Sequence, residues 1–143
     1  IRRPPRSTQG VSSAASDVYK RQTLKSIDQF EGVGILEREN IHNSPDLARR
    51  QLGTDYVLAS GRMSMTFASE SLRKFFGPEV FNHTGTVNLK FLRPVKDGDT
   101  ITVRGKVVHQ ETVDNGTLVS VHLVCENQNQ DQTAVGQGTA IIP

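Results

Sequence analysis

The sequence predicts an α+β fold in which a curved antiparallel sheet wraps around one long central helix. Three observations carry this prediction. An apolar helical pattern covers residues 62–76, and strand-like alternation recurs in four segments between residues 87 and 142. A third observation is that the last segment has small residues at every second position, which lets a helix approach the sheet closely. The 143 residues suit a single domain.

Start and stop signals define two helices. At 44–53, Ser44 is a suitable N-cap, Pro45 suits the first helical position and Gly53 suits the end. At 62–76 the apolar residues recur at helical spacing until Gly77-Pro78 ends the pattern. The apolar face of this second helix is wide, which predicts burial against a large surface. Its apolar residues are Met63, Met65, Phe67, Ala68, Leu72, Phe75 and Phe76.

Alternating apolar and polar residues predict strands at 87–92, 101–107, 119–125 and 132–142, with another strand at 32–37, before both helices. Asn115-Gly116 is a hairpin signal between the second and third of the four later strands. The small residues of the last strand are Ala134, Gly136, Gly138 and Ala140. Cys125 falls on an apolar face, which predicts an inert core thiol.

Composition excludes several classes of protein. A single cysteine excludes a disulfide framework and a cysteine-based zinc site. No His/Glu pair has helical metal-ligand spacing, so no metal is expected. Gly32-Val33-Gly34 lacks a third glycine and a following helix, which argues against a nucleotide loop. The apolar runs are too short to span a membrane, and we expect a soluble, cytoplasmic domain.

Residues 1–22 differ from the rest of the chain. They contain five basic residues and one acidic residue, whereas residues 23–143 contain 12 basic and 14 acidic residues, so the basic charge belongs to the first segment. The segment has no hydrophobic periodicity, and SSAASDVYKRQ resembles translated sequencing-adapter sequence. We therefore expect 1–22 to be a disordered, non-native tail, 23–143 to be the domain, and nucleic acid not to be a partner.

Three segments of the domain carry a family resemblance: NIHNSPDLARRQLG at 40–53, LASGRMS at 58–64 and VNLKFLRPVKDGDTITVRGKV at 87–107. Their content and order resemble the MaoC-like hydratase/dehydratase branch of the hotdog fold, over about residues 37–142. The resemblance implies a hotdog domain that adds water to a trans-2-enoyl thioester of coenzyme A, or removes it from the (R)-3-hydroxy product. It implies no cofactor beyond the coenzyme A of the substrate. It also implies a homodimer joined edge to edge, or a heterodimer with a related hotdog subunit.

The same resemblance supplies candidate site residues. The family places an Asp and a His five residues apart, and these positions hold Glu37 and His42. Both are catalytic candidates, because hydration needs a base for water and an acid for the α-carbon. Asn40, Ser60 and Gly61 are candidates for binding substrate, with the Gly61 amide at a helix start suited to a developing enolate oxygen. The chain has Asn where the family has Pro, at Asn40, and Ser where it commonly has His, at Ser60.

Other interpretations of these residues stay open. His42 can instead cap the following helix, Glu37 can be a solvated carboxylate, and Ser60 can satisfy backbone groups. His83, His109 and His122 are expected at the surface or on a strand face. Lys90, Arg93, Lys96, Arg104 and Lys106 form a basic cluster that is either a solvated face or a contact for coenzyme A phosphates.

Two further functions remain open beside the hydratase. One is a hotdog thioesterase, in which water attacks C1 of the acyl group rather than C3. The other is a catalytically weak or inactive acyl-CoA-binding subunit, which the Glu37 and Ser60 departures favour.

Overall fold

The computed structural model describes residues 14–21, 27 and 39–143. Their elements, in chain order, are β1 (Ala14–Arg21), α2 (Pro45–Leu52), β2 (Leu58–Ala59), α3 (Gly61–Phe76), α4 (Pro78–Thr84), β3 (Thr86–Phe91), β4 (Val95–Lys96), β5 (Thr100–Val113), β6 (Gly116–Glu126) and β7 (Gln132–Ile142). Five strands form an antiparallel sheet in the order β1-β5-β6-β7-β3, and β2 pairs with β4.

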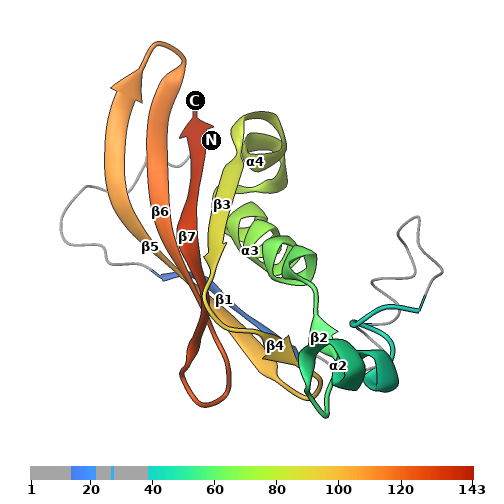
Figure 1. Ribbon diagram of the computed structural model, residues 1–143. Coiled ribbons are helices and arrows are strands. Elements are labelled where there is room, and N and C mark those ends of the chain that lie inside the picture. The colour runs from blue at the N-terminus through green and yellow to red at the C-terminus, as the bar shows by residue number, and fades with distance from the viewer. Residues whose placement is uncertain (1–13, 22–26, 28–38) are drawn as a thin grey trace.

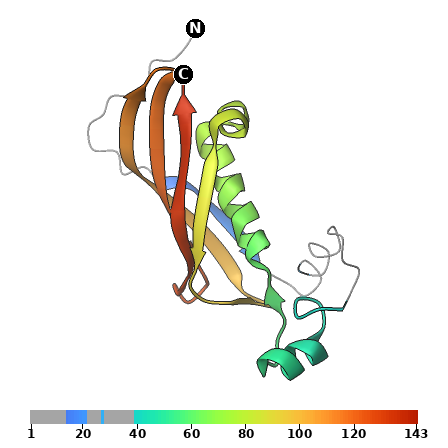
Figure 2. The same ribbon diagram turned by 45° about the horizontal axis from the view of Figure 1, so that its top comes forward.

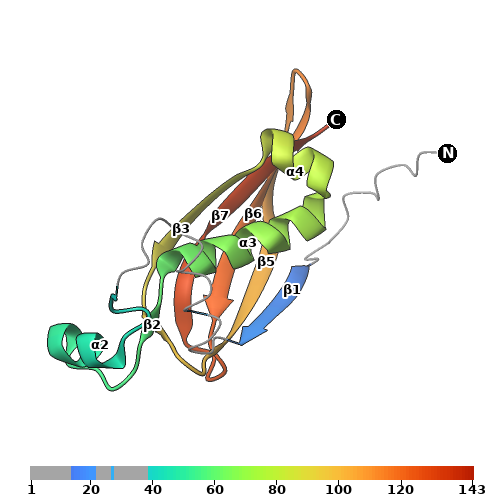
Figure 3. The same ribbon diagram turned by 90° about the vertical axis from the view of Figure 1, so that its right-hand side faces the viewer.

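Helix α3 lies across one face of the five-stranded sheet, as Figures 1 and 3 show. The start of α3 lies at the end of the molecule that holds α2, β2 and β4, and α4 lies at the opposite end (Figure 2). The sheet and helix bury a common apolar core. The predicted α+β architecture is therefore confirmed. In the described residues, no helix is both long and apolar enough to cross a membrane.

The close approach of α3 to β7 is confirmed at Gly138. A Cβ atom built on Gly138 would lie 2.3 Å from Cδ1 of Leu72, a fully buried α3 residue. Gly136 is small for a different reason, because its Cβ would lie 1.9 Å from the carbonyl oxygen of Asn88 in the neighbouring strand β3. Only one of the two central glycines therefore makes room for the helix.

The predicted helices and strands agree with the observed ones. Ser44 caps α2 by accepting a hydrogen bond from the Leu47 N–H at 3.3 Å, and Gly53 ends the helix in the left-handed conformation, with φ of 67°. Helix α4 was not predicted, since Gly77-Pro78 reads as a stop; Pro78 in fact opens the next helix, where its missing N–H costs nothing. The predicted strand at 32–37 lies outside the described residues.

The prediction of a continuous disordered tail over 1–22 is wrong for residues 14–21. These residues form β1, which pairs antiparallel with β5 between Thr100 and Lys106. Without β1, this stretch of β5 would be a sheet edge with unpaired backbone groups. Edge pairing uses main-chain hydrogen bonds, so a segment without hydrophobic periodicity can still add a strand.

The predicted core position of Cys125 is confirmed, because its side chain is fully buried. Burial raises the pKa of the Cys125 thiol from its ordinary 9.0 to about 11, since an apolar interior disfavours the thiolate. The folded protein therefore holds the proton more tightly than the unfolded chain. This contribution to stability is fully present below pH 9 and is lost as pH rises toward 11.

We expect the native Cys125 thiol to react with an aromatic disulfide reagent at pH 8 at least about 100-fold more slowly than the urea-unfolded chain, because two pKa units remove that much thiolate. Absorbance of the released thiolate measures both rates. Equal rates in native and unfolded protein would contradict the buried thiol.

Candidate active site

His42 lies in a tight turn that leads into α2. The carbonyl oxygen of Asn40 accepts hydrogen bonds from the N–H groups of Asn43, at 3.3 Å, and Ser44, at 3.0 Å. The side-chain oxygen of Asn40 accepts from the His42 N–H at 2.7 Å. Asn and Asp make such bonds to their own following backbone, which fixes a turn. Asn40 thus holds the backbone of His42, and its expected contact with substrate stays a prediction.

The His42 ring is oriented by the backbone of β2. Its Nδ1 lies 2.7 Å from the carbonyl oxygen of Leu58. A carbonyl oxygen only accepts hydrogen bonds, so Nδ1 carries the proton. In the neutral ring the lone pair is then on Nε2, which makes Nε2 the acceptor and the candidate base. The ring is half-buried, so it is held in place and still reachable.

Strand β2 connects this imidazole to the start of α3. Only Ala59 separates Leu58 from Ser60, and Gly61 follows as the first residue of α3. The chain from Leu58 to Gly61 advances by three residues and spans at most about 10 Å. The Leu58 carbonyl that bonds the His42 ring therefore lies within about 10 Å of the helix start. His42 thus bonds the strand that leads into α3, and Ser60 and Gly61 begin that helix; their shared role in a site stays a prediction.

The Ser60 hydroxyl has no hydrogen-bond partner in the part of the chain that the structure describes. Ser60 is 8% exposed, and among the described residues its Oγ is the one buried side-chain polar atom without a partner. Ser60 occupies the N-cap position of α3, yet its side chain makes no capping bond. A buried hydroxyl without a partner costs about 1–3 kcal/mol. A ligand acceptor that bonded this hydroxyl would remove that cost.

The amide groups at the start of α3 reinforce this donor. The first N–H groups of any helix lack intrahelical acceptors. Here the Met63 N–H donates to the Ser60 carbonyl at 3.0 Å, and the Gly61 N–H has no acceptor in the described part of the chain. The first turn contains no acidic residue, so the positive end of the helix dipole is not neutralised. Together, Ser60 Oγ and the Gly61 N–H suit a carbonyl oxygen that gains negative charge.

Ser60 and Ser44 make a matched pair of N-cap serines for a stability test. We expect Ser60→Ala to leave the free energy of unfolding unchanged or raise it by about 1 kcal/mol, because it removes an unpartnered buried hydroxyl. Ser44→Ala should lower that free energy by about 1 kcal/mol, because it removes a cap that bonds Leu47 and also Glu39. Urea unfolding measures both. A loss at Ser60 equal to that at Ser44 would contradict the unpartnered hydroxyl.

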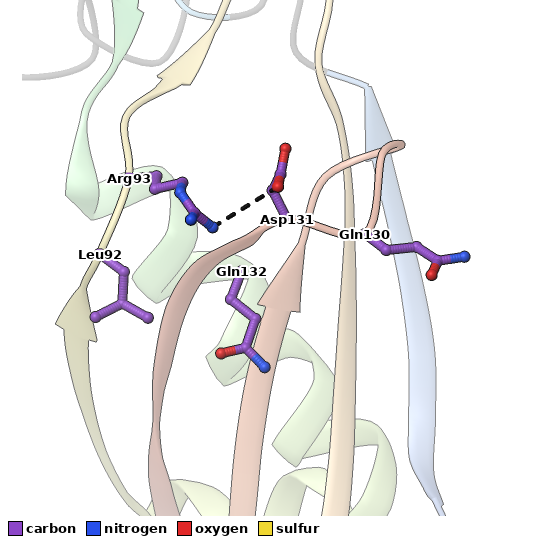
Figure 4. A pocket seen from close by; sticks show the side chains of 5 residues that line it. All are labelled: Leu92, Arg93, Gln130, Asp131 and Gln132. Carbon is purple, nitrogen blue, oxygen red and sulfur yellow. Dashed lines mark ion pairs between the residues drawn. The ribbon is translucent and has the colours of Figure 1, made fainter.

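Two hollows in the described surface lie away from these residues. One, of about 420 Å³, is lined by Leu92, Arg93, Gln130, Asp131 and Gln132, and an ion pair of 3.7 Å joins Arg93 to Asp131 across it (Figure 4). The other, of about 510 Å³, is lined by residues of β3, β6 and β7, among them Lys90, His122 and Gln137. Neither includes His42, Ser60 or Gly61, so neither is the space for an acyl group bound at α3.

The other histidines and the basic residues singled out in the sequence are not part of the candidate site. The predicted surface positions of His83, His109 and His122 are confirmed, since all three are exposed. The basic cluster is not one patch. Arg93 pairs with Asp131, Arg104 pairs with Glu126 at 3.2 Å, and Lys96 lies 5.3 Å from the centre of the Tyr56 ring. Lys90 and Lys106 are exposed on strands β3 and β5. This arrangement agrees with the solvated-face interpretation.

Glu37, the second catalytic candidate, lies outside the described residues. Two site groups had no sequence signal. The Leu58 carbonyl that orients His42 is a backbone atom 16 residues away, which no side-chain pattern reveals. The contact of Phe91 with Gly61 joins β3 to the start of α3, and only the fold brings these residues together.

Comparisons with known proteins agree with this fold. Residues 47–129 match the model of the thioesterase superfamily. No curated protein matches the chain in sequence. An unliganded R-hydratase from Pseudomonas aeruginosa is 21% identical, with a TM-score of 0.75 over 94% of this chain and 82% of that one. A MaoC-like dehydratase from Rhodospirillum rubrum is 17% identical, with a TM-score of 0.74 over 93% and 92%.

A third similar structure is a complex, the C-terminally truncated HadBC 3R-hydroxyacyl-ACP dehydratase from Mycobacterium tuberculosis. It is 18% identical, with a TM-score of 0.62 over 87% of this chain and 90% of that one. At these identities the similar structures establish the fold alone, which is the predicted hotdog fold. Since the family model matches more than half of the sequence, the chain belongs to the thioesterase superfamily.

Proposed function

We propose that the protein is an acyl-CoA hydratase/dehydratase that adds water to a trans-2-enoyl-CoA, or catalyses the reverse reaction. The observation that carries the proposal is the pairing of a tautomer-fixed imidazole with an unpartnered donor at the start of α3. The His42 Nε2 is a base, and Ser60 with the Gly61 N–H forms an anion-stabilising site. The similar fold of R-hydratases and a MaoC-like dehydratase supports the same reaction.

In the proposed reaction His42 Nε2 accepts a proton from water while the water oxygen forms a bond to C3. The π electrons of the C2–C3 bond move toward the carbonyl, whose oxygen becomes an enolate oxygen bound by Ser60 Oγ–H and the Gly61 N–H. The proton held on His42 Nε2 is then transferred to C2, the C=O double bond re-forms, and the His42 ring returns to its neutral form. Glu37 is proposed as the second proton-handling group, sharing the water with His42.

The glutamate adds one methylene to the aspartate of the family pattern. Its carboxylate reaches the same point only from a different backbone offset, and a displacement of about 1 Å costs about 100-fold in rate. Glu37→Asp therefore separates two cases. A large gain in hydration identifies a degraded site and supports the weakly active or acyl-CoA-binding subunit, whereas a loss identifies Glu37 as adapted to the reaction.

The full chain mixed with crotonyl-CoA tests the proposal. Loss of enoyl absorbance without release of free thiol supports the hydratase. If enoyl absorbance stays constant and no free thiol is released, also with longer enoyl-CoAs, the result contradicts the hydratase and favours the acyl-CoA-binding subunit.

A thioesterase is the second candidate, and the match of residues 47–129 to the thioesterase superfamily favours it. In this reaction water attacks C1 and breaks the C–S bond, so that coenzyme A leaves as a thiol. The same helix start would bind the carbonyl oxygen in either reaction. Thiol release from crotonyl-CoA and from saturated butyryl-CoA at similar rates would move the assignment to a thioesterase.

We also propose that the protein is a homodimer whose acyl site is completed by the second copy, with a heterodimer with a related hotdog subunit as the alternative. Strand β3 is at the edge of the sheet, and Phe91 and Leu92 at its end are 50% and 45% exposed. An unpaired edge ending in exposed apolar residues suits pairing with another sheet. The HadBC and ChsH1-ChsH2 complexes have a similar fold. Sedimentation equilibrium of the purified chain gives the dimer mass if the homodimer is correct, and the monomer mass if a different partner is required.

A further inference from the structure

The ring of Phe91 lies directly against the first residue of α3. A Cβ atom built on Gly61 would be 2.8 Å from Cζ, 2.9 Å from Cε2 and 3.2 Å from Cε1 of Phe91. These three atoms form the tip of the ring, so the tip points at the Gly61 backbone. Phe91 is the last residue of β3, so this contact joins the end of that strand to the start of α3.

Phe91 is exposed at a position where its strand faces the helix. Leu89, two residues earlier on the same face, is buried, and the β7 partner of Phe91 is the fully buried Ala134. Phe91 nevertheless remains 50% exposed. The exposed part of Phe91 therefore forms an apolar wall that the described chain does not cover, beside the polar donors Ser60 and Gly61.

We propose that Phe91 is a specificity-determining residue that limits substituents at C2 of the acyl thioester. This rests on the proposed function, in which the carbonyl oxygen binds at Ser60 and Gly61. C2 is bonded to the carbonyl carbon, so any group on C2 lies in the space next to the Gly61 amide. The Phe91 ring already occupies one side of that space. Thioesters with an unbranched C2 fit beside the ring, and a C2 methyl group meets it.

Butyryl-CoA and isobutyryl-CoA test this directly, because their acyl groups are isomers of equal carbon number that differ in branching at C2. Both are saturated, so binding is measured without hydration, by calorimetry on the full chain. We expect the wild-type protein to bind butyryl-CoA at least about 10-fold more tightly, since one misplaced methyl group in an apolar pocket is worth about 10–200-fold. Phe91→Ala should bring the two dissociation constants to within about threefold.

Two further variants control for general effects. Val108→Ala removes an exposed apolar side chain of β5, outside the β3 edge and the start of α3, and should keep the wild-type preference. Phe91→Leu keeps apolar bulk if alanine impairs folding, and should give an intermediate preference. Binding of both thioesters with a preference that Phe91→Ala leaves unchanged overturns this inference alone. Failure of the wild-type protein to bind either thioester overturns the proposed function and this inference together.

Discussion

If the proposed hydratase mechanism is correct, we expect His42→Ala to lower kcat/KM for crotonyl-CoA hydration by about 100- to 10 000-fold, the usual contribution of a positioned general base. The reason is geometric. The Leu58 carbonyl fixes the proton on Nδ1 and leaves Nε2 as the acceptor, and alanine has no replacement for it. Initial rates from the loss of enoyl absorbance measure the effect.

His122→Ala is the matched control for this variant. His122 is exposed on β6 and lines the hollow shared with β3 and β7, away from α3. Its loss should change kcat/KM by less than about twofold, since it takes part in no proposed step. If His42→Ala retained wild-type turnover while folding normally, another residue would be the base.

The second large effect is on stability. Leu72→Ala lowers the free energy of unfolding by about 2–5 kcal/mol, because Leu72 is fully buried between α3 and the sheet and its loss leaves a cavity. Gly138→Ala alone also destabilises, by about 1–3 kcal/mol, since its new methyl group would lie 2.3 Å from Leu72 Cδ1. Urea unfolding followed by far-ultraviolet circular dichroism measures both.

The double variant separates this contact from general damage. When Leu72 is replaced by alanine, the methyl group that Gly138→Ala introduces enters the space that the leucine side chain occupied. The Leu72→Ala/Gly138→Ala protein should therefore be more stable than the sum of the single losses predicts. Strict additivity would mean that the two residues do not share the space at the α3–β7 contact.

The sequence predicted α3 and the strands well because burial periodicity records which residues face the core. Leu72 and Ala68 fall on the buried face of α3, as their spacing indicated. Gly138 could be recognised from the run of small residues, whereas the role of Gly136 depends on its register with Asn88. Register between strands distant in the chain is set by the whole sheet, which local patterns do not contain.

The candidate site residues come from motif positions rather than from burial periodicity, and their roles stay predictions. His42 bonds the strand that leads into α3, and Ser60 and Gly61 begin that helix. The partner of the His42 ring is a backbone carbonyl, and backbone atoms have no sequence signature. The unpartnered state of Ser60 Oγ also depends on its three-dimensional surroundings, since serine at an N-cap usually bonds the helix.

Hydration of crotonyl-CoA in D₂O, followed by nuclear magnetic resonance of the product, tests the central claim most directly. The proposed mechanism predicts 3-hydroxybutyryl-CoA with its new oxygen at C3, one deuteron at C2 and an intact thioester. His42→Ala should form this product about 100- to 10 000-fold more slowly. Formation of crotonate and free coenzyme A, with C2 and C3 unchanged, would contradict the hydratase and identify hydrolysis at C1 as the reaction.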